Sequence, residues 1–372
     1  MSQVNTNAIY DASGGQSAQL YGVSMRYGGT NFVNRIINGD MRIDQRNAGA
    51  AVTVDGASVY TLDRWRATDV TSGAFTVQQS SVAPSGFNNS SLITVTSAAG
   101  SYASTDQADF IQRIEGFNIA DFAYGTASAT PTTLSFWVRS SVTGSFGGAL
   151  QNNNENYSFP FLFTISAANT WEYKTIAVSS ATAGTWVTNN GLGLVVRFSL
   201  AAGSSRLGTA GAWAAADHRG ATGQTNLLST SGATFYLTGV QLEAGAVATP
   251  FERRPYGTEL QLAQRYYLRY GTTTTDSPMT TTGAASNTTV AYPIANFPVT
   301  MRAAPTLSRN GCYLYNPALG GTNLTNLTLS AANTSYAMLA ATVASGLTSQ
   351  NTYFVSSSAA NPSHFIDFSA EL

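Results

Sequence analysis

Residues 35–46 read RIINGDMRIDQR, and this stretch decides how the rest of the chain is interpreted. Its centre, Asn38-Gly39, is a strong turn signal because both residue types tolerate a positive φ. Four apolar residues flank the turn in a strand-like pattern: Ile36, Ile37, Met41 and Ile43. A polar tail with few apolar groups precedes the stretch, and many short apolar segments follow it. The stretch therefore predicts the point where the chain enters a β-rich body.

Four segments of that body alternate apolar and polar residues, as half-buried strands do. They are 133–139 (TLSFWVR), 171–178 (WEYKTIAV), 191–200 (GLGLVVRFSL) and 233–242 (ATFYLTGVQL). Turn-rich spacers separate them, which favours an antiparallel β-sandwich over a fold of strand–helix–strand units. No repeat of 20 to 50 residues is present, so the sequence does not predict a solenoid.

One segment, 255–270 (PYGTELQLAQRYYLRY), has the features of a helix. Thr258 as N-cap and Gln261 at N3 form a capping box, and Gly271 is placed to end the helix. A helix this short needs a packing partner. The partner is either its own domain or two further copies of the chain meeting as a neck.

These patterns predict an all-β chain in four parts. Residues 1–35 contain too few apolar groups for a core of their own, and we expect neighbouring chains to order them. Residues 36–255 form a jelly-roll sandwich, 256–271 a helical neck or linker, and 272–372 a second, distal β-domain. Three copies side by side would order the tail and cover exposed strand edges.

Composition argues against several classes of function. Only 10% of the 372 residues are charged, against about 25% in an ordinary soluble domain. The net charge is −1 and Lys174 is the only lysine, so we expect no nucleic-acid partner. No apolar run of about 18 residues occurs, and we expect no membrane insertion. The N-terminus lacks the features of a secretory signal.

Seven segments together carry a resemblance to a known family. They are INGDMRIDQR (37–46), LDRW (62–65), QRIEG (112–116), TLSFWVRSS (133–141), GVQLEAGAVATPFE (239–252), ELQLAQRYY (259–267) and MRAAPT (301–306). In this order the chain resembles tailed-phage tail-fibre or receptor-binding proteins, and 36–255 is similar to carbohydrate-binding modules of jelly-roll type. Residues 307–372 carry no part of the resemblance.

The resemblance implies a homotrimeric fibre in the virion, made in the host cytoplasm and attached by 1–35 to a tail or baseplate protein. Its function would be adsorption to a host-surface glycan, lipopolysaccharide or capsule, without catalysis. A second hypothesis is a structural adaptor that links the baseplate to another receptor-binding protein. A third is a polysaccharide depolymerase.

A depolymerase needs paired carboxylates. The best cluster in the sequence comprises Asp106, Asp109, Glu115 and Asp121, which we interpret as caps and arginine partners. His218 and His364 are the only histidines and are interpreted as surface or packing residues. Cys312, the only cysteine, is interpreted as a small buried apolar residue.

Sugar binding requires aromatic faces and planar polar groups. Trp137, Arg139 and Arg197 lie on strand faces opposite the aliphatic residues, where they either line a glycan site or pack against a loop or another chain. Further candidates are Trp213, in an Ala-rich loop, and four distal tyrosines: Tyr313, Tyr315, Tyr336 and Tyr353. No cofactor is expected. A structural calcium ion would have Asp40, Asp63 and Glu243 as its only plausible donors near the matching motifs.

Overall fold

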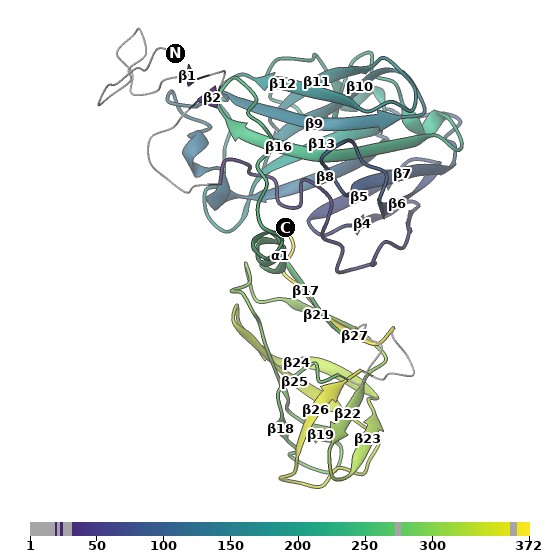
Figure 1. Ribbon diagram of the computed structural model, residues 1–372, viewed down its shortest axis with the longest axis vertical. Coiled ribbons are helices and arrows are strands. Elements are labelled where there is room, and N and C mark those ends of the chain that lie inside the picture. The colour runs from purple at the N-terminus through teal and green to yellow at the C-terminus, as the bar shows by residue number, and fades with distance from the viewer. Residues whose placement is uncertain (1–18, 21–22, 25–31, 272–276, 358–362) are drawn as a thin grey trace, which may run out of the picture.

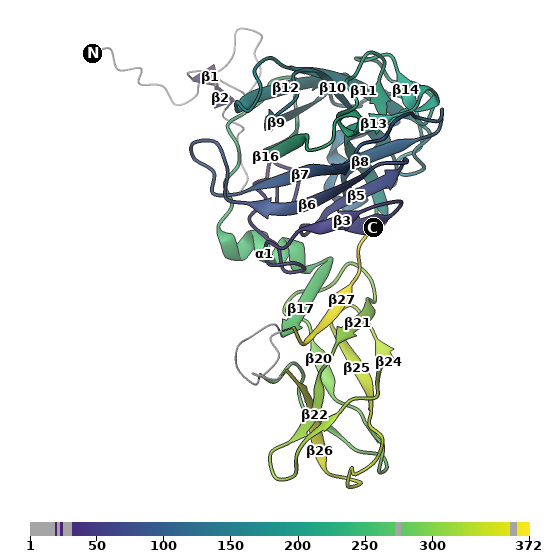
Figure 2. The same ribbon diagram turned by 90° about the vertical axis from the view of Figure 1, so that its right-hand side faces the viewer.

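The computed structural model describes residues 19–20, 23–24, 32–271, 277–357 and 363–372. A broad β-sandwich connects through the helix α1 (Tyr256–Gln264) to a narrower second unit (Figures 1 and 2). Two short strands precede the sandwich and pair with each other, β1 (Gln19–Leu20) and β2 (Val23–Ser24). Most of the predicted attachment segment, 1–35, lies outside the described residues.

The sandwich consists of two six-stranded antiparallel sheets. The first contains β3 (Val52–Val54), β6 (Ala74–Ser80), β7 (Ser90–Ser97), β9 (Thr132–Ser140), β12 (Glu172–Val178) and β16 (Thr234–Ala244), in the order β12-β9-β16-β7-β6-β3. The second contains β4 (Ser58–Tyr60), β5 (Trp65–Val70), β8 (Gln107–Glu115), β10 (Gly144–Asn152), β11 (Ser158–Ile165) and β13 (Leu192–Ala202), in the order β11-β10-β13-β8-β5-β4. The prediction of an all-β, jelly-roll sandwich is confirmed.

Short elements complete the sandwich. They are the parallel pair β14 (Leu207–Gly208) and β15 (Gly220–Ala221), and the 3-10 turns η1 (Gly116–Asn118), η2 (Ala120–Phe122), η3 (Ser204–Arg206) and η4 (Leu227–Ser229). The four strands predicted from alternation correspond to β9, β12, β13 and β16.

The core lies between the two sheets. On β9 the inward residues Leu134, Phe136 and Val138 are fully buried, whereas Trp137 and Arg139 face outward and are half-buried. Each such apolar side chain stabilises the fold by about 1.5–3 kcal/mol through burial.

The turn at Asn38-Gly39 is present, with Asn38 at φ +58°, but the flanking residues form no strand. The Asn38 amide explains this difference. Its Oδ1 accepts the Ile43 N–H at 2.9 Å, and its Nδ2 donates to the Ile43 carbonyl at 2.8 Å. These bonds close 38–43 into a compact loop, which docks on β16 where the Val240 N–H donates to the Gly39 carbonyl at 3.0 Å.

The helix prediction was wrong in extent. The helix ends at Gln264 instead of near Gly271, and Pro255, not Thr258, precedes its first turn without a side-chain cap. Residues Tyr267–Gly271 form β17, which pairs with β27 (Phe365–Ser369) near the end of the chain. The helix packs on its own chain, because Ala263 and the following Tyr266 are buried against Ile37 and Ile43.

The second unit contains three small sheets around its own core. The first has the order β17-β27-β21, with β21 at Thr306–Asn310. The second contains β18 (Gly283–Ala284), β26 (Thr352–Ser356), β22 (Tyr313–Asn316) and β23 (Gly320–Asn323). The third contains β19 (Val290–Ala291), β20 (Ile294–Asn296), β24 (Asn326–Ala332) and β25 (Tyr336–Thr342).

The last described residues return to the sandwich and tie the two units together. The Glu371 carboxylate pairs with Arg64 and with Arg46, the latter at 2.8 Å. Tyr60 donates its hydroxyl to the Leu372 carbonyl at 2.8 Å. The second unit is therefore held at two points, by α1 leading into β17 and by this C-terminal contact.

Asp63, buried beside this contact, makes stability depend on pH. Burial raises its pKa from 3.8 to about 7, although Gln45 donates to it and Arg46 lies 3.8 Å away. Between about pH 4 and pH 7 the folded carboxyl holds a proton that the unfolded one has lost, so this group makes stability fall as pH rises. We expect Asp63→Asn to increase the free energy of unfolding at pH 8 by about 2–4 kcal/mol and to change it little at pH 4.

Urea unfolding at pH 4, 6 and 8 measures this effect. Asp55→Asn, at an exposed aspartate, is the matched control and should leave the free energy of unfolding close to that of the wild type. An Asp63→Asn effect that is the same at pH 4 and pH 8 would contradict the assignment.

Candidate functional site

An open groove of about 740 Å³ lies on the outer face of the first sheet, between the strands β9 and β12 and the loop that follows β16. Its lining combines aromatic rings, hydroxyl groups and one arginine. The aromatic residues are Phe87, Trp137, Tyr173 and Phe251, the hydroxyl residues are Thr133, Thr175 and Thr249, and the arginine is Arg253.

The floor is made by outward-facing residues of two paired strands. Trp137 on β9 lies directly opposite Tyr173 on β12, with ring centroids 5.4 Å apart and planes at 49°. Tyr173 is 43% exposed and Trp137 is half-buried. Thr175 and Thr133 share this face through the period of two. The floor therefore presents two adjacent aromatic rings beside the exposed Thr175, whereas the buried Thr133 donates its hydroxyl to the Gly245 carbonyl at 2.7 Å.

The wall is made by Phe87 and Phe251, which meet edge to face with centroids 5.2 Å apart. A β-bulge in β16 brings this wall to the floor: the register shifts between Thr238 and Gln241, and Gly239 adopts φ +60°. A Cβ at Gly239 would lie 2.7 Å from the Phe87 ring and 3.1 Å from the Trp137 ring. Glycine at this position allows both rings to lie against β16.

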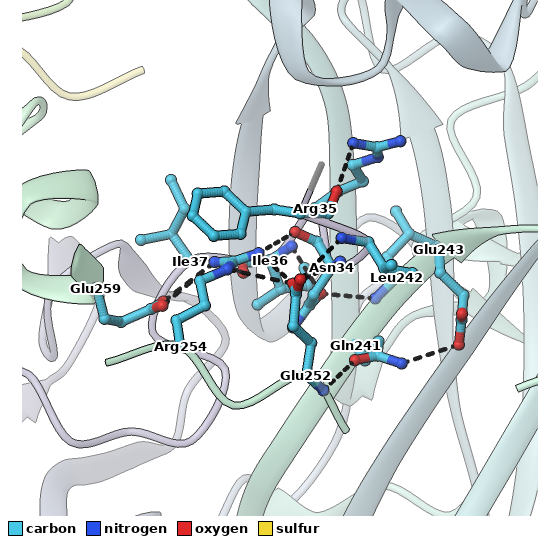
Figure 3. Close-up of polar contacts among 12 residues, drawn as sticks. Asn34, Arg35, Ile36, Ile37, Gln241, Leu242, Glu243, Glu252, Arg254 and Glu259 are labelled. Atoms are coloured by element: carbon cyan, nitrogen blue, oxygen red, sulfur yellow. Dashed lines mark hydrogen bonds and ion pairs between the residues drawn. The ribbon is translucent and has the colours of Figure 1, made fainter. Parts of the chain in front are cut away.

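The loop is fixed by a hydrogen-bond network around two glutamates (Figure 3). Glu243 accepts the Thr249 N–H at 2.8 Å and the Thr249 hydroxyl at 2.7 Å. Gln241 donates to Glu243 at 2.9 Å and accepts the Glu252 N–H at 2.8 Å.

The same network reaches the stretch that precedes the Asn38-Gly39 turn. The Glu252 carboxylate accepts the N–H groups of Val33 and Asn34 at 3.1 and 3.0 Å. Asn34 in turn donates its side-chain amide to the Val240 carbonyl at 3.0 Å. The segment GVQLEAGAVATPFE thus supplies the Phe251 side of the wall and holds it with these hydrogen bonds, which the sequence alone did not indicate.

Of the predicted site residues, Trp137 lies in the groove. Arg139 is on the same face but is not among the lining residues. Its guanidinium lies 4.9 Å over the Tyr236 ring and donates to the Asn169 carbonyl at 2.9 Å. The other aromatic and charged lining residues were missed: Phe87, Tyr173, Phe251 and Arg253. Only Tyr173 had a local signal, its outward position in the alternating segment 171–178.

Two predicted ligand residues are buried, and these predictions are corrected. Arg197, on β13 of the other sheet, is 1% exposed because the segment that contains β14 and β15 covers the outer face of that sheet. Its guanidinium donates to Asp109 at 2.6 Å. Tyr353 is 2% exposed in the core of the second unit. Both residues serve packing in this structure.

Trp213 belongs to an aromatic cluster at the edge of the sandwich. Its ring stacks on Tyr157 at 5.4 Å and meets Trp186 edge-on at 5.6 Å, and its N–H donates to the Ser179 carbonyl at 2.7 Å. Tyr157 therefore covers one face of the Trp213 ring, and that face is not free to stack on a sugar.

The distal tyrosines take different positions. Tyr313 and Tyr315 line a second hollow of about 410 Å³ together with Phe354, whose ring lies 5.4 Å from Tyr315. Tyr315 is 38% exposed. Tyr336, 42% exposed on β25, is not among the residues that line this hollow.

Each of the four candidate acids has partners of its own on this chain. Asp109 binds Arg197, and Glu115 accepts bonds from Arg265 at 2.6 Å and from the Tyr266 hydroxyl at 2.6 Å. The other two contacts are Asp121 with Arg35, and Asp106 with the N–H of Ala103. This geometry agrees with their interpretation as caps and arginine partners.

No group of three or more His, Cys, Asp or Glu side chains in the described part of the chain is placed to hold a metal ion. The three carboxylates considered for calcium have protein partners. Asp40 pairs with Arg42 at 3.1 Å, Asp63 accepts from Gln45 at 2.5 Å, and Glu243 accepts from Thr249. Among the helices that the structure describes, none has the length and apolar character needed to span a bilayer.

No family model and no curated protein matches the sequence. Solved structures that match the fold include the enzymatically active domain of tailspike protein 4 of bacteriophage CBA120, at 12% identity and TM-score 0.32, covering 57% of this chain and 22% of that one. A CBM4 structure matches at 14% identity and TM-score 0.27, covering 56% and 98%. The family 11 carbohydrate-binding module of Lic26A-Cel5E of Clostridium thermocellum matches at 12% identity and TM-score 0.25, covering 54% and 99%. At these TM-scores the matches assign no function.

Proposed function

We propose that this chain binds a surface glycan in the groove on β9 and β12. The observation that supports this most directly is the pairing of Trp137 and Tyr173 on an open floor that also carries the exposed Thr175. The apolar faces of sugar rings stack on aromatic faces, while hydroxyl and guanidinium groups bond to the sugar hydroxyls. A groove open along its length admits a chain as well as a single sugar.

In this proposal the protein is a virion fibre that adsorbs to host lipopolysaccharide or capsule without cleaving it. Three copies assemble, and residues 1–35 attach them to a tail or baseplate protein. The support is the sequence resemblance along residues 5–306 and the core-poor N-terminal segment. Individually weak sites suit this task because linking sites raises avidity by about 10²–10⁴ when all can engage. Native mass spectrometry tests the assembly, and a monomer would overturn it.

Trp137→Ala tests the groove. We expect it to weaken glycan binding by about 30-fold, since loss of a central aromatic contact costs about 2 kcal/mol. Binding is measured by calorimetry against a panel of purified bacterial lipopolysaccharides and capsular polysaccharides, with product sizing to detect cleavage.

Tyr336→Ala is the matched control, because this exposed tyrosine lies outside the groove and should leave affinity unchanged. A folded Trp137→Ala protein with wild-type affinity would refute the site, and release of oligosaccharides would refute the absence of catalysis.

A further inference from the structure

Arg253 gives the groove its charge. Of the described residues that line the groove, it is the only one that carries an ionisable charge at neutral pH. It is exposed on the wall, with its guanidinium carbon 4.5 Å from the Phe87 ring centroid and 5.7 Å from that of Phe251. A guanidinium held over aromatic rings is attracted by their faces and stays oriented while its N–H groups are free to bind a ligand.

No carboxylate in the described part of the chain lies within ion-pairing distance of Arg253. The neighbouring Arg254 shows the contrast: it is buried, and its guanidinium pairs with Glu252 at 3.1 Å and Glu259 at 3.3 Å. Asp40, the half-buried acid on this side, pairs with Arg42 at 3.1 Å, and Arg253 is a weaker charged neighbour of it without forming an ion pair. The two adjacent arginines therefore have separate positions, one in the scaffold and one at the groove.

The acids nearest the groove are also occupied. Glu243 is bonded to Thr249 and Gln241, and Glu252 to the backbone of Val33 and Asn34. The positive charge of Arg253 is therefore not neutralised from within the wall. Next to the floor of Trp137 and Tyr173, it supplies an unpaired cation to whatever occupies the groove.

We infer, as a deepening of the proposed glycan-binding function, that the groove selects a polysaccharide whose repeat carries a carboxylate, such as a hexuronic acid. The sugar ring stacks on the aromatic floor while Arg253 binds the carboxylate. The planar guanidinium matches a carboxylate with two parallel N–H···O bonds, and charge-assisted bonds of this kind are about twice as strong as neutral ones. The distal hollow has tyrosine rings but no charged residue among the described residues that line it, so these residues provide no such selection.

The test compares acidic capsular polysaccharides before and after chemical reduction of their carboxyl groups, which leaves the sugar rings in place. We expect the full-length wild-type protein to bind the native form about 10- to 100-fold more tightly than the reduced form. Arg253→Gln should remove most of this difference, because it weakens binding of the native form far more than binding of the reduced form, and Arg253→Lys should restore part of it. Arg139→Gln, on the same face outside the groove, is the control and should keep the preference.

Three outcomes would overturn the inference. If the native and reduced forms bind equally and Trp137→Ala still weakens binding, the selection for a carboxylate is refuted but the glycan site is supported. Equal affinity for sulfated glycans without carboxylates replaces the assignment with a general anion site. Polysaccharide binding that Trp137→Ala does not change refutes the groove itself. Since Arg253 is exposed, thermal unfolding of Arg253→Gln should match the wild type.

Discussion

Replacing Arg197 by methionine is expected to lower the free energy of unfolding by about 3–5 kcal/mol, because it leaves a buried carboxylate without its partner. The Arg197 side chain is 1% exposed and that of Asp109 is 0% exposed. Arg197 also donates to Gln151 at 3.0 Å and to Glu155 at 3.2 Å. Methionine keeps much of the volume but supplies no charge and no N–H group.

The double variant Arg197→Met with Asp109→Leu separates charge from packing. Replacing a whole buried ion pair by apolar residues is often close to neutral, so the double variant should recover most of the loss.

Burial raises the pKa of Asp109, and Arg219 and Glu155 are its other charged neighbours. In the single variant the deficit should therefore shrink as pH falls and the carboxyl gains a proton. Urea unfolding at pH 5 and pH 8 measures both effects. If Arg197→Met lowers the free energy of unfolding by less than about 1 kcal/mol, the Asp109 carboxylate does not depend on Arg197 for its stabilisation.

Arg197 and Trp137 show how far strand alternation can predict a site. Alternation correctly placed both residues on faces opposite the aliphatic core. It could not say what covers each face, because the cover comes from segments distant in the sequence. The β14–β15 segment lies over Arg197, whereas Trp137 lies beside an open groove. The same local pattern thus produces a buried ion pair in one sheet and a candidate binding floor in the other.

The helix was predicted too long and the groove wall was missed for the same physical reason, which is that contacts between distant segments determine both. Residues 265–271 carry local helix signals, but pairing of β17 with β27 connects positions about 100 residues apart and determines the outcome. Phe87 and Arg253 lie in loops without periodicity, and only the bulge at Gly239 brings that wall to Trp137. The turn at Asn38-Gly39 was recognisable from its two residue types, although only Asn38 adopts a positive φ and Gly39 is required by its close approach to the Val240 carbonyl.

Gly39→Ala is expected to destabilise the protein by about 3 kcal/mol, at the upper end for an overpacked site. A Cβ at Gly39 would lie 2.2 Å from the Val240 carbonyl oxygen, and that atom is backbone of β16 and has no rotamer by which to move away. Gly257→Ala is the matched control. A Cβ there has open space, and alanine in α1 should be neutral or stabilise by up to about 1 kcal/mol.

Gly39→Ala should also weaken glycan binding, since Val240 directly follows Gly239, against which the Phe87 and Trp137 rings lie. Displacing the Asn38-Gly39 loop moves the bulge, and a shift of the bulge separates the wall from the floor. Calorimetric affinity measured below the unfolding transition distinguishes this effect from unfolding. A Gly39→Ala protein as stable as Gly257→Ala would show that the loop does not dock on β16. A destabilised Gly39→Ala protein that keeps full affinity would show that the groove does not depend on this contact.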